Sequence, residues 1–339
     1  MSELKYNVLL PDNYKSILDL RRTQQAIKFL KDTFERELAK ALHLSRVSAP
    51  LFVDPDSGLN DNLNGVERPV SFEVAHSGVQ LEIVHSLAKW KRMALGEYGY
   101  SIGEGLYTDM NAIRRDEVVD NLHSIYVDQW DWELVIDPAE RNFATLKRIV
   151  EHIYSAIKCV EWLVCNRFPE VKPALPNEVS FITSQELLDM YPGMSVKERE
   201  NAYAKEKGAI FIMQIGKKLS DGTVHDGRAP DYDDWEINGD ILVWFAPLNC
   251  AVELSSMGIR VDAAALRSQL AESGHNERAN LPFHKMLLEG KLPQTIGGGI
   301  GQSRLCLVLL KKAHIGEVQV SYWPPKMIED CRKCGIEIL

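Results

Sequence analysis

The pattern of apolar and polar positions predicts two long amphipathic helices. Between residues 23 and 42, apolar side chains recur every three or four positions, and charged side chains fill the intervals. Residues 137–168 repeat this spacing, and Asp137 followed by Pro138 is typical of a helix N-cap and first turn. We expect the second helix to cover the back of a sheet.

Segments in which apolar and polar residues alternate predict the strands of that sheet. Residues 46–53 contain Pro50, which limits backbone hydrogen bonding, so we expect an edge or interface strand there. Residues 125–132 carry polar side chains along one face, which suits a ligand-binding surface. The other predicted strands are 70–74, 79–84, 179–182, 209–215, 240–244, 251–254 and 258–261.

Two pairs of these strands are close enough in sequence to form hairpins. We expect 70–74 to pair with 79–84 with one face buried, and 240–244 to pair with 251–254, with 258–261 as a third strand. Ser184 and Ser195 are candidate caps for helices between strands. A further helix, 302–312, is expected after the glycine-rich residues 297–301. This order of elements predicts an α+β fold, an antiparallel sheet flanked by helices, rather than a doubly wound one.

Length and composition narrow the class of protein. We expect the 339 residues to form a single catalytic domain, 1–339, with peripheral segments at 1–22 and 326–339. No apolar run approaches the roughly 20 residues that cross a bilayer, and no secretory or transit signal is apparent, so we expect a cytoplasmic protein without a membrane partner. The net charge of −9 argues against nucleic acid as a partner.

The six cysteines are scattered, and we interpret them as reduced thiols. Cys331 and Cys334 have the spacing of half a zinc site or of a redox pair, but no second pair completes a ligand set. The favoured interpretation is a C-terminal segment that carries two thiols. His85, His123 and His225 likewise lack the companions of a metal or nucleophile motif.

Two segments have the residue types that bind phosphates. Residues 297–304, GGGIGQSR, combine close backbone approach with a helix start and the guanidinium of Arg304, although an isolated glycine-rich segment is more often a structural turn. It is neither a Walker A nor a Rossmann motif. Arg114 precedes Glu117 where a loop could join two strands, and an arginine there could hold an α-phosphate and a carboxylate together. The alternative is a solvated charged turn.

Acids and cations at three other places suit ligand binding. Asp240 and Glu253 could bind Mg²⁺ that bridges triphosphate oxygens, and Arg260 could pair with a substrate carboxylate. A structural ion network is the alternative. The acidic loop 226–235 contains proline and aromatic residues, which favours an ordered loop. The basic run at 89–92 is of a kind that usually lies on a solvent-exposed surface.

Together these segments resemble the ammonia-dependent asparagine synthetase family and, through it, the catalytic core of class II aminoacyl-tRNA synthetases. The resemblance runs from about Thr23 to about Pro324. The first helix with the Pro50 strand is similar to motif 1, the dimer element; Arg114 to Glu117 is similar to motif 2, and 297–304 to motif 3. Segments distinctive of the synthetase family are 85–91, 126–132, 228–235 and 253–260. The stretch 240–260 is also similar to aspartyl-tRNA synthetases. The departures are Arg115, where proline is common, and the extra residues 331–339.

The resemblance implies a homodimer that takes L-aspartate, ammonia and ATP as substrates, with Mg²⁺. It implies that Arg114 clamps the α-phosphate, that Arg304 lies over adenine and reaches the terminal phosphates, and that Glu253, with Asp240 or Glu117, holds the metal. Lys91 and Arg260 would bind the two aspartate carboxylates, and either could take either carboxylate. Asp61, Gln129 and Asp131 would bind the α-amino group, and the remaining implied aspartate ligands are Ser86, Asp233 and Ser256. The remaining implied ATP ligands are Gly297, Gly299 and Gly301.

The implied reaction joins the β-carboxylate of aspartate to AMP, releases pyrophosphate, and lets ammonia displace AMP. Asp233 and Asp61 are the candidates to take the ammonium proton. Because the synthetase core uses the whole chain, we expect no glutaminase domain and free ammonia as the nitrogen source. A tRNA ligase would carry an anticodon-binding barrel of about 100 residues, which we do not find. An amino-acid sensor that retains the fold without activity is the other alternative.

Overall fold

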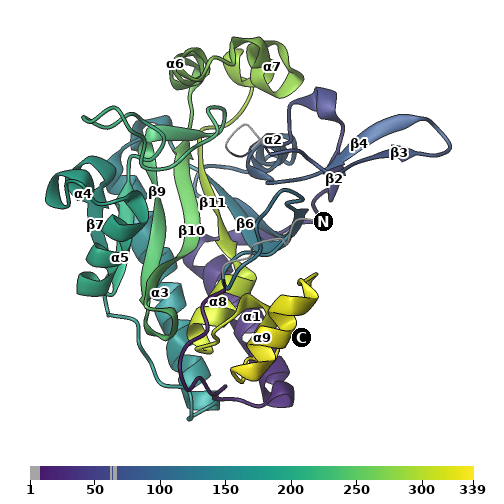
Figure 1. Ribbon diagram of the computed structural model, residues 1–339. Helices are drawn as coiled ribbons and strands as arrows, with labels where there is room; N and C mark the ends of the chain where they lie inside the picture. Colours follow the sequence, from purple (N-terminus) through teal and green to yellow (C-terminus); the bar gives the residue numbers. More distant parts are fainter. Residues whose placement is uncertain (1–7, 62, 64–66) are drawn as a thin grey trace.

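The computed structural model describes residues 8–61, 63 and 67–339, and these residues build an eight-stranded sheet with helices on both faces (Figure 1). Neighbouring strands run antiparallel except at the two ends of the sheet, where the outer pairs are parallel. The expected α+β class is confirmed. In spatial order the strands are β1 (Leu44–Arg46), β5 (Gly105–Ile113), β6 (Tyr126–Val135), β11 (Thr295–Gly301), β10 (Cys250–Arg260), β9 (Asp233–Phe245), β8 (Ala209–Met213) and β7 (Ser180–Thr183).

The alternation along β6 separates the main core from a polar surface. Trp130 and Trp132 point to one face and lie within the main hydrophobic core. Gln129 and Asp131 point to the other face. The polar face that the sequence predicts for this strand is therefore confirmed, and it is the face on which a site can form.

Two long helices cover the core face of the sheet (Figure 1). α1 (Leu20–Leu42) and α3 (Phe143–Arg167) pack on each other and bury apolar residues at the predicted helical spacing. The predicted cap of the second helix is wrong, because Asp137 caps only the short 3-10 helix η2 (Pro138–Glu140). The chain then turns, and α3 begins with Asn142 as its N-cap.

The smaller helices surround the sheet. Of the two predicted caps, Ser195 forms a capping box with Glu198, whereas Thr183 caps α4 in place of Ser184. The α-helices are α2 (Ala88–Glu97), α4 (Ser184–Met190), α5 (Val196–Lys207), α6 (Ala263–Ser273), α7 (Pro282–Leu288), α8 (Gln302–Leu309) and α9 (Pro325–Lys333). The other 3-10 helices are η1 (Pro55–Ser57), η3 (Ala246–Leu248), η4 (Asn276–Asn280) and η5 (Ile315–Glu317).

The segment around Pro50 forms two short strands instead of one. β1 adds to the edge of the large sheet, and β2 (Phe52–Val53) pairs with β4 (Val79–Ile83), which pairs with β3 (Ser71–Val74). The predicted hairpin is present, but the expected buried face is not, because Phe72 and Val79 are exposed. Figure 1 shows this small sheet projecting from the body of the molecule.

The predicted strand at 258–261 is the end of β10 and not a separate strand. β9 and β10 form one long antiparallel hairpin that η3 and Asn249 close, with Asn249 in the left-handed conformation. An irregularity lies between Glu253 and Ser255, and the pairing then continues to Arg260. Asp240 and Arg260, which are twenty positions apart in the sequence, thus lie on the same hairpin.

The C-terminal segment belongs to the core. Met327 and Cys331 of α9, together with Ile336, are fully buried in the main hydrophobic cluster. The expectation that residues 326–339 are peripheral is therefore wrong for these side chains. All six cysteines are unpaired, as expected for reduced thiols. Within the described residues, no helix has the length and apolar character needed to span a bilayer.

Candidate active site

A cavity of about 410 Å³ lies over the polar face of the sheet. Strands β6, β9, β10 and β11, the start of α8 and the loop between β5 and β6 all contribute to it. Every site residue that the sequence predicts lines this cavity except Gly297 and Asp240. The predicted residues that line it are Asp61, Ser86, Lys91, Arg114, Glu117, Gln129, Asp131, Asp233, Glu253, Ser256, Arg260, Gly299, Gly301 and Arg304.

The glycine-rich segment is a strand in the floor of the cavity, not a turn before a helix. β11 pairs with β6 so that Gly297, Gly299 and Gly301 lie opposite Glu133, Asp131 and Gln129. A Cβ at Gly299 would lie 2.5 Å from Gln129 Oε1 and 2.9 Å from Asp131 Oδ1, and one at Gly297 would collide with the Glu133 carboxylate. The glycines therefore make room for a row of polar side chains from β6.

The start of α8 is already occupied by a carboxylate. Asp128 accepts hydrogen bonds from the Ser303 backbone N–H at 3.1 Å and from its hydroxyl at 2.9 Å. Lys31 of α1 donates to the same carboxylate at 2.8 Å. The expectation that this helix start offers its N–H groups to a phosphate is therefore corrected, because an aspartate takes the position of the anion.

Arg260 is held by two buried carboxylates. Its Nε and Nη2 donate to Glu133 at 2.9 and 2.7 Å, and its Nη1 donates to Asp233. Burial opposes the charge of Arg260, but Glu133 and Asp233 outweigh it, and the pKa of Arg260 is raised. Burial also tends to raise the pKa of Glu133, yet Arg260 and Lys91 outweigh it and hold that pKa below its usual value. These three bonds use three of the five guanidinium N–H groups, so two remain for a ligand in the cavity.

Lys91 is buried, and its three N–H groups all have acceptors. Nζ contacts the carbonyls of Trp132 at 2.9 Å and Gly298 at 3.0 Å, and Asp131 Oδ1 at 3.0 Å. Burial lowers the pKa of Lys91. In this arrangement the ammonium of Lys91 fixes the Asp131 carboxylate, and none of its N–H groups is left for a substrate carboxylate.

The expectation of a solvent-exposed basic surface at 89–92 is wrong. Lys89 pairs with Asp231 at 3.1 Å, and both side chains are at most 4% exposed. Arg92 donates to the backbone carbonyls of Pro293 and Val261 at 2.9 and 2.7 Å, and burial lowers its pKa to about 10. Helix α2 is thus a cationic element inside the protein, and it places charge beneath the cavity floor.

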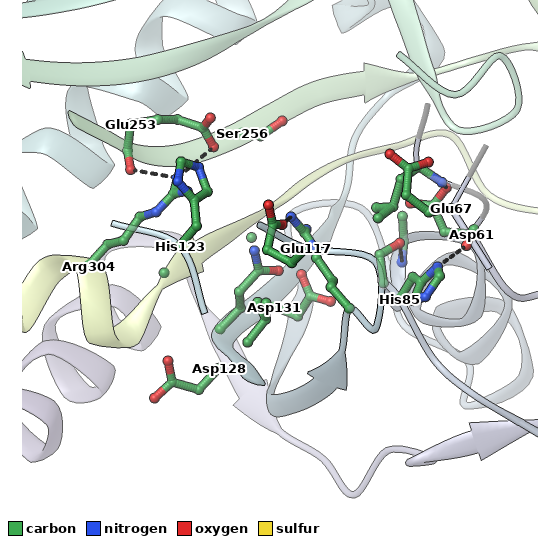
Figure 2. Close-up of a pocket in the computed structure, with 18 of the residues that line it drawn as sticks. Asp61, Glu67, His85, Glu117, His123, Asp128, Asp131, Glu253, Ser256 and Arg304 are labelled. Atoms are coloured by element: carbon green, nitrogen blue, oxygen red, sulfur yellow. Dashed lines mark hydrogen bonds and ion pairs between the residues drawn. The ribbon is translucent and has the colours of Figure 1, made fainter. Parts of the chain in front are cut away.

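One end of the cavity contains Asp61 and His85, which Figure 2 shows side by side. His85 is 1% exposed, and its Nδ1 lies 3.0 Å from the backbone carbonyl of Asp61. Asp61 Oδ1 accepts from the N–H of Leu63 at 2.8 Å. Two buried acceptors here, Asp61 Oδ2 and His85 Nε2, have no hydrogen-bond partner among the described residues.

The other end is lined by arginines. Arg304 lies 3.7 Å from the Glu253 carboxylate, and Figure 2 shows this pair away from Asp61 and His85. Arg114 and Glu117 lie 3.9 Å apart in the loop between β5 and β6, where the sequence predicts them. The Nε atom of Arg114 is buried and lacks a hydrogen-bond acceptor among the residues described. A donor of this kind suits an anion.

Asp240 lies just beneath the cavity wall and pairs with Arg228. Burial, with Glu253 and Asp226 as further causes, raises the pKa of Asp240 to about 7. The described part of the chain contains no group of three or more His, Cys, Asp or Glu side chains arranged to hold a metal ion. Glu253 is partly exposed and fits a metal that takes its other ligands from phosphates, whereas Asp240 fits only if Arg228 moves away.

Several residues of the cavity region are not among the predicted site residues, and three of them are Glu133, Arg228 and His85. Glu133 continues the two-residue period of Gln129 and Asp131 on β6, and this period could have identified it. Arg228 lines the cavity with its Nε lacking an acceptor among described residues. His85 was considered only for metal or nucleophile roles, and only the fold reveals its position beside Asp61.

Two of the predicted polar ligands lie at the cavity without strong contacts of their own. The Ser86 hydroxyl accepts from the Ala88 N–H at 3.4 Å, where the chain enters α2. Ser256 lies opposite Asp240 on the neighbouring strand β9. Both positions place a hydroxyl on the cavity wall.

Comparison with known proteins places this site in a family. Residues 21–335 match the family model described as aspartate-ammonia ligase. A curated aspartate–ammonia ligase from Clostridium tetani is 61% identical over 333 residues, which are 98% of this chain and 98% of that protein. Another from Clostridium perfringens is 59% identical over 333 residues, covering 98% and 99% of the two chains.

Solved structures show the same fold at low identity. Asparaginyl-tRNA synthetase from Entamoeba histolytica, in complex with asparaginyl-adenylate, superposes with a TM-score of 0.64 at 14% identity, over 88% of this chain and 66% of that one. The enzyme from Pyrococcus horikoshii gives 0.64 at 15% identity, over 89% and 70%. The expected likeness to class II aminoacyl-tRNA synthetase catalytic domains is confirmed. The family match and the near full-length relatives show that the chain belongs to the aspartate–ammonia ligase family of enzymes.

Proposed function

We propose that this enzyme makes L-asparagine from L-aspartate and ammonia, using ATP, through a β-aspartyl-adenylate, with release of AMP and pyrophosphate. The observation that carries the proposal is one cavity with two chemically distinct ends. Buried carboxylates with Arg260 suit an amino acid in one part of the cavity, and Arg114 and Arg304 in the same cavity suit phosphates. The family names of the relatives, aspartate–ammonia ligase, agree with this chemistry.

Aspartate would bind over the polar row of β6. Gln129 and Asp131 present acceptors for the α-ammonium group, and Lys91 holds Asp131 in place. Arg260 has two N–H groups left for one carboxylate of the substrate, and the bonds that it donates to Glu133 and Asp233 fix the plane of its guanidinium. Ser86 and Ser256 are hydroxyl donors within the same cavity. Lys91 thus acts as a positioning residue in this proposal rather than as a carboxylate ligand.

ATP would bind with its α-phosphate at Arg114. The Nε of Arg114 has no partner among the described residues, and its Nη1 lies 3.9 Å from the Glu117 carboxylate, so its guanidinium is available to an anion. Arg304 would lie over the adenine, and the backbone of Gly299 and Gly301 would approach the nucleotide closely. Gly297 supports this arrangement indirectly, because its missing side chain accommodates Glu133.

Mg²⁺ would be held by Glu253, with triphosphate oxygens as its other ligands, and would supply charge that offsets the phosphates. Asp240 joins as a ligand only when Arg228 leaves it. Arg114 and Arg304 would stabilise negative charge on the phosphates while a β-carboxylate oxygen attacks the α-phosphorus and pyrophosphate departs. Holding both reactants in line in one cavity supplies much of the rate.

A product assay tests the proposal. Purified protein is incubated with ATP, Mg²⁺, aspartate and either ammonium or glutamine, and asparagine, AMP and ADP are measured. We expect asparagine and AMP in equal amounts with ammonium. ADP as the nucleotide product would contradict the adenylate, and equal use of glutamine would contradict ammonia as the nitrogen source.

We also propose a homodimer that works in the cytoplasm. Leu51 and Phe52 of the motif 1 segment, with Phe72, expose apolar side chains on the small projecting sheet. The Phe52 and Phe72 rings lie 5.3 Å apart, edge to face, and form the centre of this patch. Six unpaired cysteines suit a reducing compartment.

A further inference from the structure

The end of the cavity that contains Asp61 and His85 has hydrogen-bond acceptors without partners among the described residues. It therefore suits a cation that donates hydrogen bonds. Asp61 and His85 line the cavity, each is 1% exposed, and each has one acceptor atom without a partner among the described residues. A buried acceptor left without a donor destabilises the site, and a ligand that donates a hydrogen bond removes that cost. Phosphates and carboxylates offer no donor for these atoms, whereas ammonium offers four. The α-ammonium group of aspartate offers three, but the proposed function places it at Gln129 and Asp131.

The tautomer of His85 is fixed by its neighbour. Nδ1 lies 3.0 Å from the backbone carbonyl oxygen of Asp61. A carbonyl oxygen can only accept, so Nδ1 carries a hydrogen, and in the neutral ring Nε2 carries the lone pair. His85 is held in place further by its backbone N–H, which donates to the Asn60 side chain at 3.0 Å. The ring therefore presents a fixed base at one wall of the cavity.

The surroundings favour a positive charge at this end. Tyr232 lines the cavity and packs against Arg260, and burial together with Asp61 and Asp233 raises the pKa of its phenol well above the usual value. Two carboxylates thus act on the same side chain, and the phenol stays protonated. Ammonium entering here meets the Asp61 carboxylate and the His85 imidazole, while Arg304 lies at the other end.

We propose that the Asp61 and His85 pair is the ammonium site and that His85 Nε2 takes the proton that ammonium must lose before it can attack. The inference rests on the proposed function, because it needs an acyl-adenylate as the partner of ammonia. It moves the role of base from the carboxylates that the sequence suggests to a histidine beside one of them.

The proposed step forms one C–N bond and breaks one C–O bond. His85 Nε2 takes one proton from NH₄⁺ and becomes an imidazolium, which leaves NH₃ with a lone pair. That pair forms the C–N bond at the adenylate carbonyl, and the C–O bond breaks with its electron pair leaving on AMP. The new nitrogen then gives its surplus proton to the Asp61 carboxylate, and the neutral amide remains. Both protons later pass to water.

The test separates the two halves of the reaction in His85→Asn. The asparagine amide can donate to the Asp61 carbonyl as Nδ1–H does, but it cannot take a proton. We expect aspartate-dependent exchange of labelled pyrophosphate into ATP to stay within about threefold of wild type. We expect asparagine formation from ammonium at neutral pH to fall by about 100-fold or more, the usual scale for loss of a general base.

Turnover with hydroxylamine distinguishes a general base from a residue with a merely structural role. This amine is largely unprotonated at neutral pH, so it needs no base, and we expect His85→Asn to form the aspartyl hydroxamate at a rate within about tenfold of wild type. His85→Gln, which keeps an acceptor near Nε2 but not a base, should behave in the same way. His225→Asn, at a buried histidine outside the cavity lining, is the matched control and should retain synthesis from ammonium.

Equal loss of exchange and synthesis in both His85 variants would overturn the inference, because His85 would then act on aspartate or ATP. Failure of hydroxylamine to restore turnover, with exchange retained, would also overturn it. Absence of aspartate-dependent exchange in the wild-type enzyme would instead overturn the proposed function itself.

Discussion

At the scale of single residues, glycine shapes the site as much as the polar side chains do. Gly299 lies opposite Asp131 on the neighbouring strand, and its hydrogen faces the Gln129 and Asp131 side chains. Because β6 fills the space that a larger residue would need, the glycine sets the position of two side chains that we propose as aspartate ligands. A methyl group there must displace at least one of them.

Gly299→Ala therefore tests the role of the polar row. The added Cβ would lie 2.5 Å from Gln129 Oε1 and 2.9 Å from Asp131 Oδ1. We expect the KM for aspartate to rise by about tenfold or more, equivalent to at least ~1.4 kcal/mol of lost binding, with a smaller change in the KM for ATP. Steady-state kinetics with each substrate varied will measure this. Gly78→Ala, in the open turn of the projecting hairpin, is the control and should leave both constants unchanged; unchanged aspartate kinetics in Gly299→Ala would contradict the proposed binding position.

At the scale of elements, a buried ion cluster joins three segments around the site. Asp231 precedes the cavity residues Tyr232 and Asp233, and its Oδ2 lies 3.1 Å from Lys89 of α2 and 3.0 Å from His284 of α7. Burial opposes the charge of Asp231, but Lys89 and His284 outweigh it and lower its pKa. The cluster fixes the loop before β9 against two helices.

Asp231→Asn should loosen this junction. The change leaves Lys89 buried without its counter-ion, and we expect a loss of about 3–5 kcal/mol in the free energy of unfolding. Urea denaturation followed by tryptophan fluorescence will measure the loss. Asp32→Asn, which removes an exposed pair with Lys28 on α1, is the comparison and should cost less than about 0.5 kcal/mol. Equal costs for the two variants would show that the buried cluster adds little.

His314 gives the C-terminal region a defined response to pH. Its Nδ1 accepts from the Gly316 N–H at 3.0 Å, its ring meets Trp323 edge to face, and burial lowers its pKa to about 4 from 6.5. Because the folded pKa is depressed, the stability from this group is fully present above pH 6.5 and is lost as the pH falls toward 4.

His314→Asn keeps an acceptor for Gly316 but cannot titrate. We expect wild type to lose roughly 2 kcal/mol more stability than this variant between pH 7 and pH 5. Urea unfolding of both proteins at the two pH values gives the difference. Parallel losses in the two proteins would mean that His314 does not titrate on unfolding in this range.

The elements differ in how well the sequence predicts them. The helices at α1 and α3 and the strands around β6 follow from periodicity alone, because each buries one continuous face. Strand β11 does not, because glycine has little strand preference and its pairing is set by the side chains of β6. The sequence predicts two strands, 251–254 and 258–261, where the structure has the single strand β10. It does not show that β10 pairs with β9 again beyond the irregularity at residue 254.

The site followed the same division. The family motifs predict the candidate site residues, and most of these residues do line one cavity. The hydrogen-bond and ion-pair partners of these residues do not follow from the sequence. Lys91 was expected to bind substrate, and its acceptors lie on β6 and β11, over 40 and over 200 positions away. The burial of α2 depends on the same distant strands, so no local pattern could reveal it.

At the scale of the whole molecule, the projecting small sheet is the surface with the clearest need for a partner. Phe52 is 44% exposed and Phe72 37% exposed, and their rings are in contact. Light scattering should give a particle of twice the 38.4 kDa chain mass, and Phe52→Glu should shift it toward the monomer. Trp162→Glu, on the exposed side of α3, is the control and should remain dimeric. A monomeric wild type would contradict the proposed homodimer, and a dimeric Phe52→Glu would place the interface elsewhere.

The central claim is that the β-carboxylate of aspartate becomes bonded to AMP, and isotope transfer tests it most directly. Aspartate carrying heavy oxygen in its β-carboxylate is turned over with ATP, Mg²⁺ and ammonium, and the products are analysed by mass spectrometry. The account predicts one heavy oxygen atom in the phosphate of AMP and none in pyrophosphate. Heavy oxygen in inorganic phosphate or in pyrophosphate, or AMP without label, would contradict the adenylate.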